Sequence, residues 1–158
     1  MSKRTTSATA VDLEDLPGYH IRRLHQIAVA VFLEETAPHG VTPVQYGVLH
    51  VVGESPGIDQ RTLARAVGID TSTIAGVVDR LQARGLMLRH PSPADRRVRM
   101  LKLTGEGRAL LRAVVPSMLR SQQRMLEPLP PAERAAFMRM LRMLVTANNA
   151  LSRAPSEA

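Results

Sequence analysis

In the middle of the chain, three short residues with hydroxyl groups are closely followed by an alanine and a glycine, which have little or no side chain. This combination is suited to contacting a nucleic acid. Thr71, Ser72 and Thr73 are followed, after one apolar residue, by Ala75 and Gly76. At the start of a helix, such side chains let backbone N–H groups and hydroxyls approach phosphates and base edges without steric obstruction. With nearby basic and amide residues, the predicted DNA contacts in this stretch are Gln60, Arg61, Thr71, Ser72, Thr73, Ala75, Gly76 and Arg80.

A second group of arginines lies in a turn-rich stretch further along the chain. Residues 91–97 read Pro-Ser-Pro-Ala-Asp-Arg-Arg, and Arg99 follows shortly afterwards. Arginine is favoured electrostatically at phosphates and in a narrow minor groove, so Arg96, Arg97 and Arg99 are further predicted DNA contacts. The alternative is an exposed hairpin with ordinary surface arginines, but ordinary surface charge does not explain their clustering at one tip.

The hydroxyl-bearing residues need a helix start to present them, and residues 58–81 predict one within a helix-turn-helix. Asp59 and Asp70 are each placed as N-caps, and Gly68 suits the left-handed conformation that ends the first helix. The apolar stripes of the two helices comprise Leu63, Ala64, Val67, Ile74, Val77, Val78 and Leu81. The alternative is an ordinary helical hairpin in a hydrophobic core, which would not need a face of small side chains at residues 71–76.

The arginine-rich stretch is predicted to form the tip of a β-hairpin. Residues 86–90 form a short apolar run, and residues 98–103 alternate with a period near two, which is typical of strands. Two strands and a charged loop directly after a helix-turn-helix constitute a wing. The predicted fold class is therefore mainly α, a winged helix-turn-helix with a two- or three-stranded wing.

Amphipathic helices flank this module on both sides. The spacing of apolar residues predicts helices over residues 19–36, from Pro43, from Thr104 to about Glu127, and from about Ala132, and Pro116 predicts a kink or break. The predicted buried positions are Ile21, Leu24, Ile27, Ala28, Val31, Phe32, Val44, Gly47, Val48, Val51, Val52, Phe137, Met140, Leu141, Leu144 and Val145. A small module has too little surface to bury all of these, so we expect a homodimer through the N- and C-terminal helices.

Charge follows the same division of the chain. Residues 1–57 carry 4 basic and 6 acidic groups, residues 58–104 carry 9 and 4, and residues 105–153 carry 8 and 3, for a net charge of +7 in the whole chain. A basic middle suits nucleic acid or an anionic surface, although solvated helix faces can also be basic. The predicted segments are a flexible tail (1–16), N-terminal helices for dimerisation and a pocket (17–57), a DNA-binding lobe (58–104), C-terminal dimerisation helices (105–153) and a tail (154–158).

Composition and missing motifs exclude several classes of function. Cysteine is absent, so disulfides, thiolate metal sites and thiol redox switches are excluded. An aromatic content of 3% argues against base stacking on single strands. No apolar run is long enough to span a membrane and no signal peptide is recognisable, so the cytoplasm is the expected location. No catalytic or nucleotide-binding motif is present, so we expect neither an enzyme nor a cofactor.

The chain resembles the multiple antibiotic resistance regulator (MarR) family of winged-helix transcriptional regulators. The resemblance covers about residues 18–153 and is carried by LARAVGIDTSTIAGVVDRLQARGL and PSPADRRVRMLKLTGEG, with the Asp-x-Arg wing followed by Leu-Thr and a glycine. Asp95 and Arg97 are similar to the wing-supporting aspartate and the minor-groove arginine of that family. Pro116 in the dimerisation helix is a departure, and the lack of cysteine excludes the peroxide-sensing branch.

The resemblance implies a function and a mechanism. Members of the family form triangular dimers on pseudo-palindromic operators, with recognition helices in major grooves about 34–36 Å apart or slightly more. They usually repress nearby genes and release DNA when a small molecule, often an aromatic acid, enters a pocket between the dimer helices and the DNA-binding lobe. The alternative is an architectural DNA-binding protein with little sequence specificity, which competition between operator and random duplex at stated salt would distinguish.

Four polar or aromatic residues on the first two helices are candidates for holding such an effector. Arg23 or a protonated His20 suits a carboxylate, and Tyr46, which shares a helix face with His50, suits a ring. Each has a structural alternative, since the histidines can be solvent-facing or dimer hydrogen-bonders and Tyr46 can be core. A zinc site built from the five histidines is not expected, because none lies in a short ligand motif.

Overall fold

The predicted mainly α, winged helix-turn-helix class is confirmed by the computed structural model, which describes residues 11–155. Parts of the expected tails (1–10 and 156–158) lie outside the described residues. The elements are η1 (Leu13–Asp15), α1 (Pro17–Glu35), η2 (Ala37–His39), α2 (Pro43–Glu54), β1 (Ile58–Asp59), α3 (Gln60–Val67), α4 (Thr71–Ala83), β2 (Met87–Pro91), β3 (Arg99–Leu103), α5 (Gly105–Leu126), α6 (Pro131–Asn148) and η3 (Asn149–Leu151).

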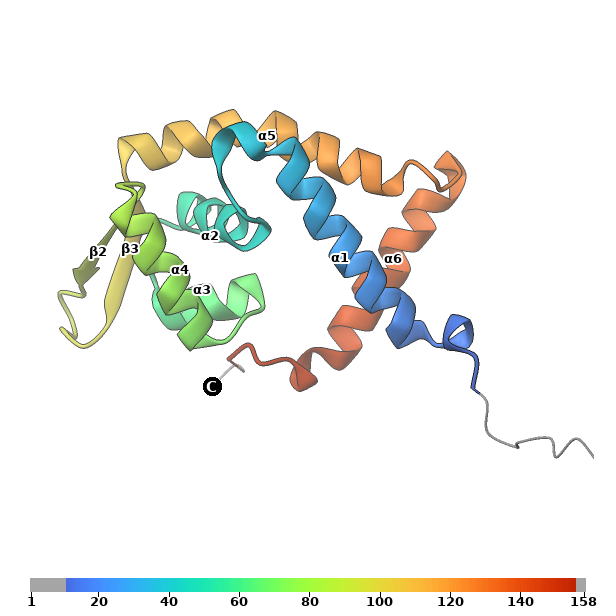
Figure 1. Ribbon diagram of the computed structural model, residues 1–158. Helices are drawn as coiled ribbons and strands as arrows, with labels where there is room; N and C mark the ends of the chain where they lie inside the picture. Colours follow the sequence, from blue (N-terminus) through green and yellow to red (C-terminus); the bar gives the residue numbers. More distant parts are fainter. Residues whose placement is uncertain (1–10, 156–158) are drawn as a thin grey trace, which may run out of the picture.

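The long helix α5 joins two parts of the molecule. Along one half of α5 lie α2, α3, α4 and the wing strands, and along the other half lie α1 and α6 (Figure 1). α1 packs against α5, and α2 packs against α3, α4 and α5. In this view the start of α4 and the tip of the β2–β3 hairpin both point downward, at the lower edge of the half of the molecule that contains the wing.

The helix-turn-helix has the caps that its sequence predicts. The Asp59 side chain accepts a hydrogen bond from the Thr62 N–H at the start of α3, and the Asp70 side chain accepts one from the Thr73 N–H at the start of α4. Gly68 ends α3 with φ 77° and ψ 32°, the left-handed conformation in which a Cβ atom is unfavourable.

The wing belongs to a three-stranded antiparallel sheet in the order β1-β3-β2. Met87 pairs with Leu103 and Pro91 with Arg99. The first wing strand therefore spans residues 87–91 instead of the predicted 86–90, and the second spans residues 99–103 instead of 98–103. Ile58 pairs with Leu101, which makes the residues just before α3 an edge strand. This two-residue strand is too short for any periodicity, so its pairing depends on the tertiary fold.

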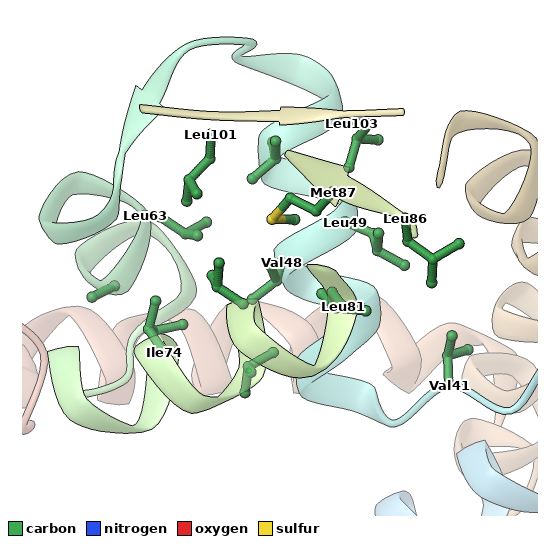
Figure 2. Close-up of a cluster of buried hydrophobic side chains, with 14 of the residues drawn as sticks. Val41, Val48, Leu49, Leu63, Ile74, Leu81, Leu86, Met87, Leu101 and Leu103 are labelled. Carbon is green, nitrogen blue, oxygen red and sulfur yellow. The ribbon is translucent and has the colours of Figure 1, made fainter. Parts of the chain in front are cut away.

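The core fills the space between the helix-turn-helix, α2 and the sheet (Figure 2). Leu63 of α3, Ile74 and Leu81 of α4, Met87 of β2 and Leu101 of β3 are all fully buried. The predicted apolar stripe of α4 is confirmed, since all four of its members are buried, whereas the predicted α3 residue Val67 is only partly buried. The core therefore fixes α4 against the sheet and leaves its opposite face free.

The apolar stripes of the outer helices, for which the sequence analysis expected a second copy as the packing partner, stay largely exposed in the single chain. Phe32 is the buried member of the α1 stripe, whereas Ile21 and Ile27 are 58% and 49% exposed. In α6 the stripe residues Met140 and Leu144 are 50% and 53% exposed. The reason is that periodicity identifies an apolar face but not its partner, and within one chain these faces have little to pack against.

Two further details of the helices differ from expectation. Of the kink or break predicted at Pro116, the break does not occur, since α5 continues through this residue. In α2 the predicted residues Val48 and Val52 are buried, and Leu49, which was not predicted, is buried as well. α2 is enclosed by α3, α4, α5 and β3, so more than one of its faces is covered.

A close backbone contact fixes the start of α5 against the wing. The position of a Cβ atom on Gly107 would lie 2.0 Å from the backbone oxygen of Leu86. That oxygen accepts a hydrogen bond of 3.1 Å from the Thr104 N–H, and the Thr104 hydroxyl donates to the Gly85 oxygen at 2.7 Å. Glycine is therefore required at position 107 for α5 to begin beside β2.

Candidate nucleic-acid interface

The first turn of α4 presents three hydroxyl-bearing side chains to solvent. Thr71, Ser72 and Thr73 are exposed, whereas Ala75 and Gly76 are partly buried. A Cβ atom on Gly76 would lie 3.5 Å from a terminal nitrogen of Arg80, so the Arg80 guanidinium extends back over this bare position. The arrangement brings a helix N-terminus, hydroxyls and one guanidinium to a single exposed surface, which suits an anionic duplex.

The Asp70 carboxylate organises this turn through three hydrogen bonds. Its Oδ1 accepts from the Ser72 hydroxyl at 2.6 Å and from the Thr73 N–H at 2.8 Å. Its Oδ2 accepts from the Thr73 hydroxyl at 2.7 Å. These bonds stabilise the charged form, with the Ser72 hydroxyl the largest contributor, and hold the pKa of Asp70 far below its usual range.

The other predicted helix-turn-helix contacts lie at the start of α3. Gln60 is the first residue of α3 and is partly buried, whereas Arg61 is exposed. Asp59, which caps this helix, has a lowered pKa because hydrogen bonds from Thr62 and backbone N–H groups outweigh its partial burial. α3, which packs against α4, thus carries an exposed cation in its first turn.

The wing tip is an ordered turn with exposed arginines. The Asp95 carboxylate accepts a 2.9 Å hydrogen bond from the Arg97 backbone N–H, and the Asp95 backbone oxygen accepts one of 2.9 Å from Val98. Asp95 therefore supports the loop through the backbone. The side chains of Arg96, Arg97 and Arg99 are all exposed, and within residues 11–155 none of them forms an ion pair. They are available to phosphates.

An ion pair that the sequence analysis did not identify ties the wing to α4. Arg89 of β2 donates to Oδ1 of Asp79 in α4 at 2.7 Å. Arg89 Nε is buried and has no hydrogen-bond partner among the described residues, and the same holds for Nδ1 of His90. No spacing rule identifies such a pair, because a helix and a strand are brought together only by the fold.

Three of the four effector candidates line two separate cavities in the single chain, and Tyr46 is in the lining of neither. His20 and Arg23 line an open groove of about 600 Å³ between α1 and α6, whose apolar wall includes Ile27 and Leu144. His50 lies against a different, shallower cavity between α2 and α3. The chain alone therefore does not bring the four predicted residues together.

The polar end of the α1–α6 groove contains several hydrogen-bonded side chains. A ring nitrogen of His20 donates to the Glu14 backbone oxygen at 2.8 Å. Arg23 donates to the Tyr19 hydroxyl at 3.1 Å, and its guanidinium lies 5.5 Å from the centre of the Tyr19 ring. A cation at one end of an apolar groove is a group that would hold the carboxylate of an aromatic acid. Tyr19 contacts Arg23 but is not part of the groove lining.

Tyr46 and His50 form a stacked pair on α2. Their ring centres are 6.0 Å apart with planes 14° from parallel. Tyr46 also packs against the buried Phe32, with ring centres 6.1 Å apart, and burial raises the pKa of its hydroxyl. Tyr46 is thus partly a core residue, which agrees with its structural alternative.

Ion pairs between α1 and α5 connect the groove to the rest of the molecule. Glu35, near the end of α1, accepts from Arg120 at 3.1 Å and from Arg124 at 2.8 Å. Glu34 pairs with Arg124 at 3.2 Å. The Arg124 and Arg120 guanidiniums hold the pKa of Glu35 below its usual value. These contacts join residues far apart in sequence, so the sequence analysis did not find them.

Two structural features are absent from the described residues. No group of three or more histidine, aspartate or glutamate side chains is placed to hold a metal ion within residues 11–155. None of the helices described is both long and apolar enough to cross a bilayer.

Sequence comparison places the chain among transcriptional regulators. Residues 39–98 match the MarR family. The HTH-type transcriptional repressor NicR of Pseudomonas putida is 31% identical over 151 residues, covering 92% of this chain and 96% of that protein. A putative transcriptional regulatory protein for the hcr operon of Thauera aromatica is 37% identical over 128 residues, covering 80% and 77%.

Solved structures with the same fold include ligand-bound and DNA-bound regulators. PcaV of Streptomyces coelicolor, solved with its natural ligand, has a TM-score of 0.80 and 38% identity over 88% of this chain and 98% of that chain. The transcriptional repressor CouR, solved bound to a 23-mer DNA duplex, has a TM-score of 0.79 and 33% identity, covering 87% of this chain and 99% of that chain. A CouR from Rhodococcus jostii has also been solved. BpsR of Bordetella bronchiseptica, whose DNA binding is regulated by 6-hydroxynicotinic acid, has a TM-score of 0.81 and 32% identity over 86% and 97%.

Proposed function

The chain belongs to the MarR family of transcriptional regulators, and from this premise we propose that it is a homodimeric repressor released from its operator by a small aromatic acid. The observation that carries the proposal is the shared edge formed by the exposed start of α4 and the arginine-bearing wing tip (Figure 1). A helix N-terminus fits a major groove, and arginines beside it fit phosphates or the adjacent minor groove.

The exposed apolar faces of the outer helices favour a second copy of the chain as the partner. Ile21 and Ile27 of α1 and Met140 and Leu144 of α6 are all about half exposed. Contiguous exposed apolar surface of this kind is typical of an interface rather than of a monomer. An isologous dimer through α1 and α6 would cover it and would pair two recognition helices for a pseudo-palindromic site.

The polar end of the groove between α1 and α6, at His20 and Arg23, is the proposed effector site, and the apolar residues further along the groove are the part that the partner subunit would cover. Arg23 would pair with the carboxylate, the adjoining apolar side chains would contact the ring, and His20 would add a polar contact. The regulation of BpsR by 6-hydroxynicotinic acid supports this ligand class. Tyr46 and His50 stay a second candidate site, because their stacked rings lie on α2 beside a separate cavity lined by His50.

Release of DNA would follow if the effector prefers a dimer whose recognition helices no longer match the half-site spacing. The ligand shifts the equilibrium by its difference in affinity for the two dimer geometries. A coupling of about 1–3 kcal/mol would weaken DNA binding about 5- to 150-fold.

Selection from fragments of the source genome tests the function. We expect the full chain to enrich a small number of duplexes, and to bind them at fixed salt at least about 10³-fold more tightly than random duplex of equal length. A ratio near one, with steep salt dependence, would instead support the architectural alternative. Failure to retain any duplex would contradict both DNA-binding functions.

A further inference from the structure

The hydroxyl groups at the start of α4 have a fixed hydrogen-bond polarity. Ser72 Oγ lies 2.6 Å from one oxygen of the Asp70 carboxylate, and Thr73 Oγ1 lies 2.7 Å from the other. An ionised carboxylate carries no hydrogen and can only accept, so each hydroxyl must donate its single hydrogen to Asp70. The lowered pKa of Asp70 keeps the carboxylate ionised at neutral pH.

The consequence is that these two hydroxyls have only lone pairs left for DNA. A hydroxyl has one hydrogen and two acceptor sites, and here the hydrogen is already used. Rotating it outward would break a hydrogen bond to a charged group, which is about twice as strong as a neutral one. Within residues 11–155, the neighbouring Thr71 hydroxyl makes no such bond to Asp70, so the restriction applies to Ser72 and Thr73.

An acceptor-only side chain distinguishes bases in a specific way. In the major groove, the exposed hydrogen-bond donors are the N6 amino group of adenine and the N4 amino group of cytosine. Guanine offers the acceptors N7 and O6, and thymine offers the acceptor O4 and a methyl group. Phosphate oxygens also only accept. A lone pair facing one strand therefore favours adenine or cytosine there over guanine or thymine.

We propose that Ser72 and Thr73 are specificity-determining residues that act as hydrogen-bond acceptors and select amino-bearing bases, adenine or cytosine, on the strand that the start of α4 faces. The inference rests on the proposed function, since it assigns a base preference to the same surface. It also gives Asp70 a second role: besides capping α4, it sets the polarity of the reading surface.

Base analogues in a selected duplex provide the first test. The full chain is used to select binding sites from a random duplex library. Each adenine of the consensus is then replaced by 2-aminopurine, which lacks the N6 amino group, and each cytosine by N4-methylcytosine, whose methyl group replaces the outward hydrogen. At one or two positions per half-site, we expect binding to weaken about three- to tenfold, the range for one hydrogen bond.

Variants of the two hydroxyls assign that loss. Ser72→Ala removes one hydroxyl, and Thr73→Val removes the other at similar side-chain volume. Each variant should bind the natural duplex and the duplex substituted at the base that its residue contacts with equal affinity. Thr73→Ser is the matched control and should keep the discrimination. Circular dichroism and thermal melting establish that each variant is folded before its affinities are compared.

Asp70→Asn tests the polarity itself. Asparagine is an equally good N-cap, so α4 should keep its start. Its amide nitrogen, placed toward Thr73 Oγ1, would donate to that oxygen and free the hydroxyl hydrogen for DNA. The selected base at the Thr73 position should then shift toward guanine or thymine by about three- to tenfold. Ratios between duplexes are compared, so the general gain in affinity from removing a negative charge cancels.

The outcomes separate the inference from the proposed function. If no sequence is enriched by the wild-type chain, the proposed function fails and the inference fails with it. If sites are enriched but the analogue effects persist in Ser72→Ala and Thr73→Val, the inference alone is overturned. It is overturned equally if the positions sensitive to these variants respond to 7-deazapurines and not to loss of an amino group, since the hydroxyls would then be donating.

Discussion

Arg97 combines a fixed backbone with a free side chain. Its N–H is held by Asp95 at 2.9 Å, while the guanidinium is exposed at the wing tip. Arg97→Ala should weaken binding of the selected duplex by about 1–3 kcal/mol without unfolding the protein, because the groove contact is lost and the turn is kept. Fluorescence anisotropy at fixed salt measures this change, with Arg112→Ala on the exposed side of α5 as control. Equal affinities of the Arg97 variant and wild type would remove Arg97 from the interface.

Arg23 provides a residue-scale test of the effector site. We expect 6-hydroxynicotinic acid to raise the melting temperature of the wild-type chain and 6-hydroxynicotinamide, which lacks the carboxylate, to raise it less. At a hundredfold excess over Kd, the gain is about 2.7 kcal/mol. Arg23→Met should abolish the difference between acid and amide because it removes the guanidinium from the groove.

The control for that experiment is the neighbouring cation. Arg22 bonds to Gln26 at 3.2 Å and is not part of the groove lining, so Arg22→Met should respond to the acid like the wild type. A carboxylate-dependent shift that survives in Arg23→Met would place the acid elsewhere, with the Tyr46–His50 region the next candidate.

At the scale of elements, the junction between β2 and α5 depends on one glycine. Gly107→Ala should destabilise the chain by about 1–3 kcal/mol or more, because the new methyl group collides with a backbone oxygen that cannot move without displacing a strand. Urea denaturation followed by circular dichroism measures the free energy of unfolding. Gly105→Ala is the matched control, since nothing lies within 4 Å of its Cβ position, and it should be neutral or slightly stabilising. Similar stabilities of both variants would contradict the close contact.

The ion pair between α4 and β2 predicts coupling between the two DNA-contacting elements. Arg89→Met removes the link to Asp79 and should allow the wing to change its angle to the recognition helix. Part of the contribution of Arg97 to operator affinity should then be lost. The affinity losses of Arg89→Met and Arg97→Ala should therefore be non-additive by at least about 0.5 kcal/mol. A double-mutant cycle on operator affinity measures this coupling. Strict additivity would mean that the wing is positioned without the ion pair.

How far the sequence predicted these elements depends on how local their chemistry is. Asp59, Gly68 and Asp70 act on residues within one helical turn, so the boundaries of α3 and α4 could be read directly. Strand β1 and the Arg89–Asp79 pair depend on segments brought together by the fold, and no spacing rule identifies them. The residue types and the family resemblance predicted which surface contacts DNA, but the hydrogen-bond polarity of that surface required atomic positions.

For the whole molecule, the sequence predicted apolar faces on α1 and α6 and a second copy of the chain as the partner that covers them. We predict that Leu144→Asp, in the exposed apolar face of α6, shifts the chain from dimer to monomer at micromolar concentration because a carboxylate would have to be buried unpaired. Light scattering coupled to size exclusion measures the mass. Leu88→Asp, at an apolar position of the wing that is 47% exposed, should leave the mass unchanged. A wild-type monomer would contradict the proposed dimer.

The uninterrupted course of α5 has a mechanical consequence. A helix of 22 residues is about 33 Å long, and this one is anchored to α1 by the Glu35 ion pairs toward one end and to β2 by Gly107 at the other. It can therefore act as a lever: a tilt of about 5° at the α1 end would displace the wing end by about 3 Å. An effector no larger than a single aromatic ring could thus move α4 and the wing by a distance comparable to one base-pair step.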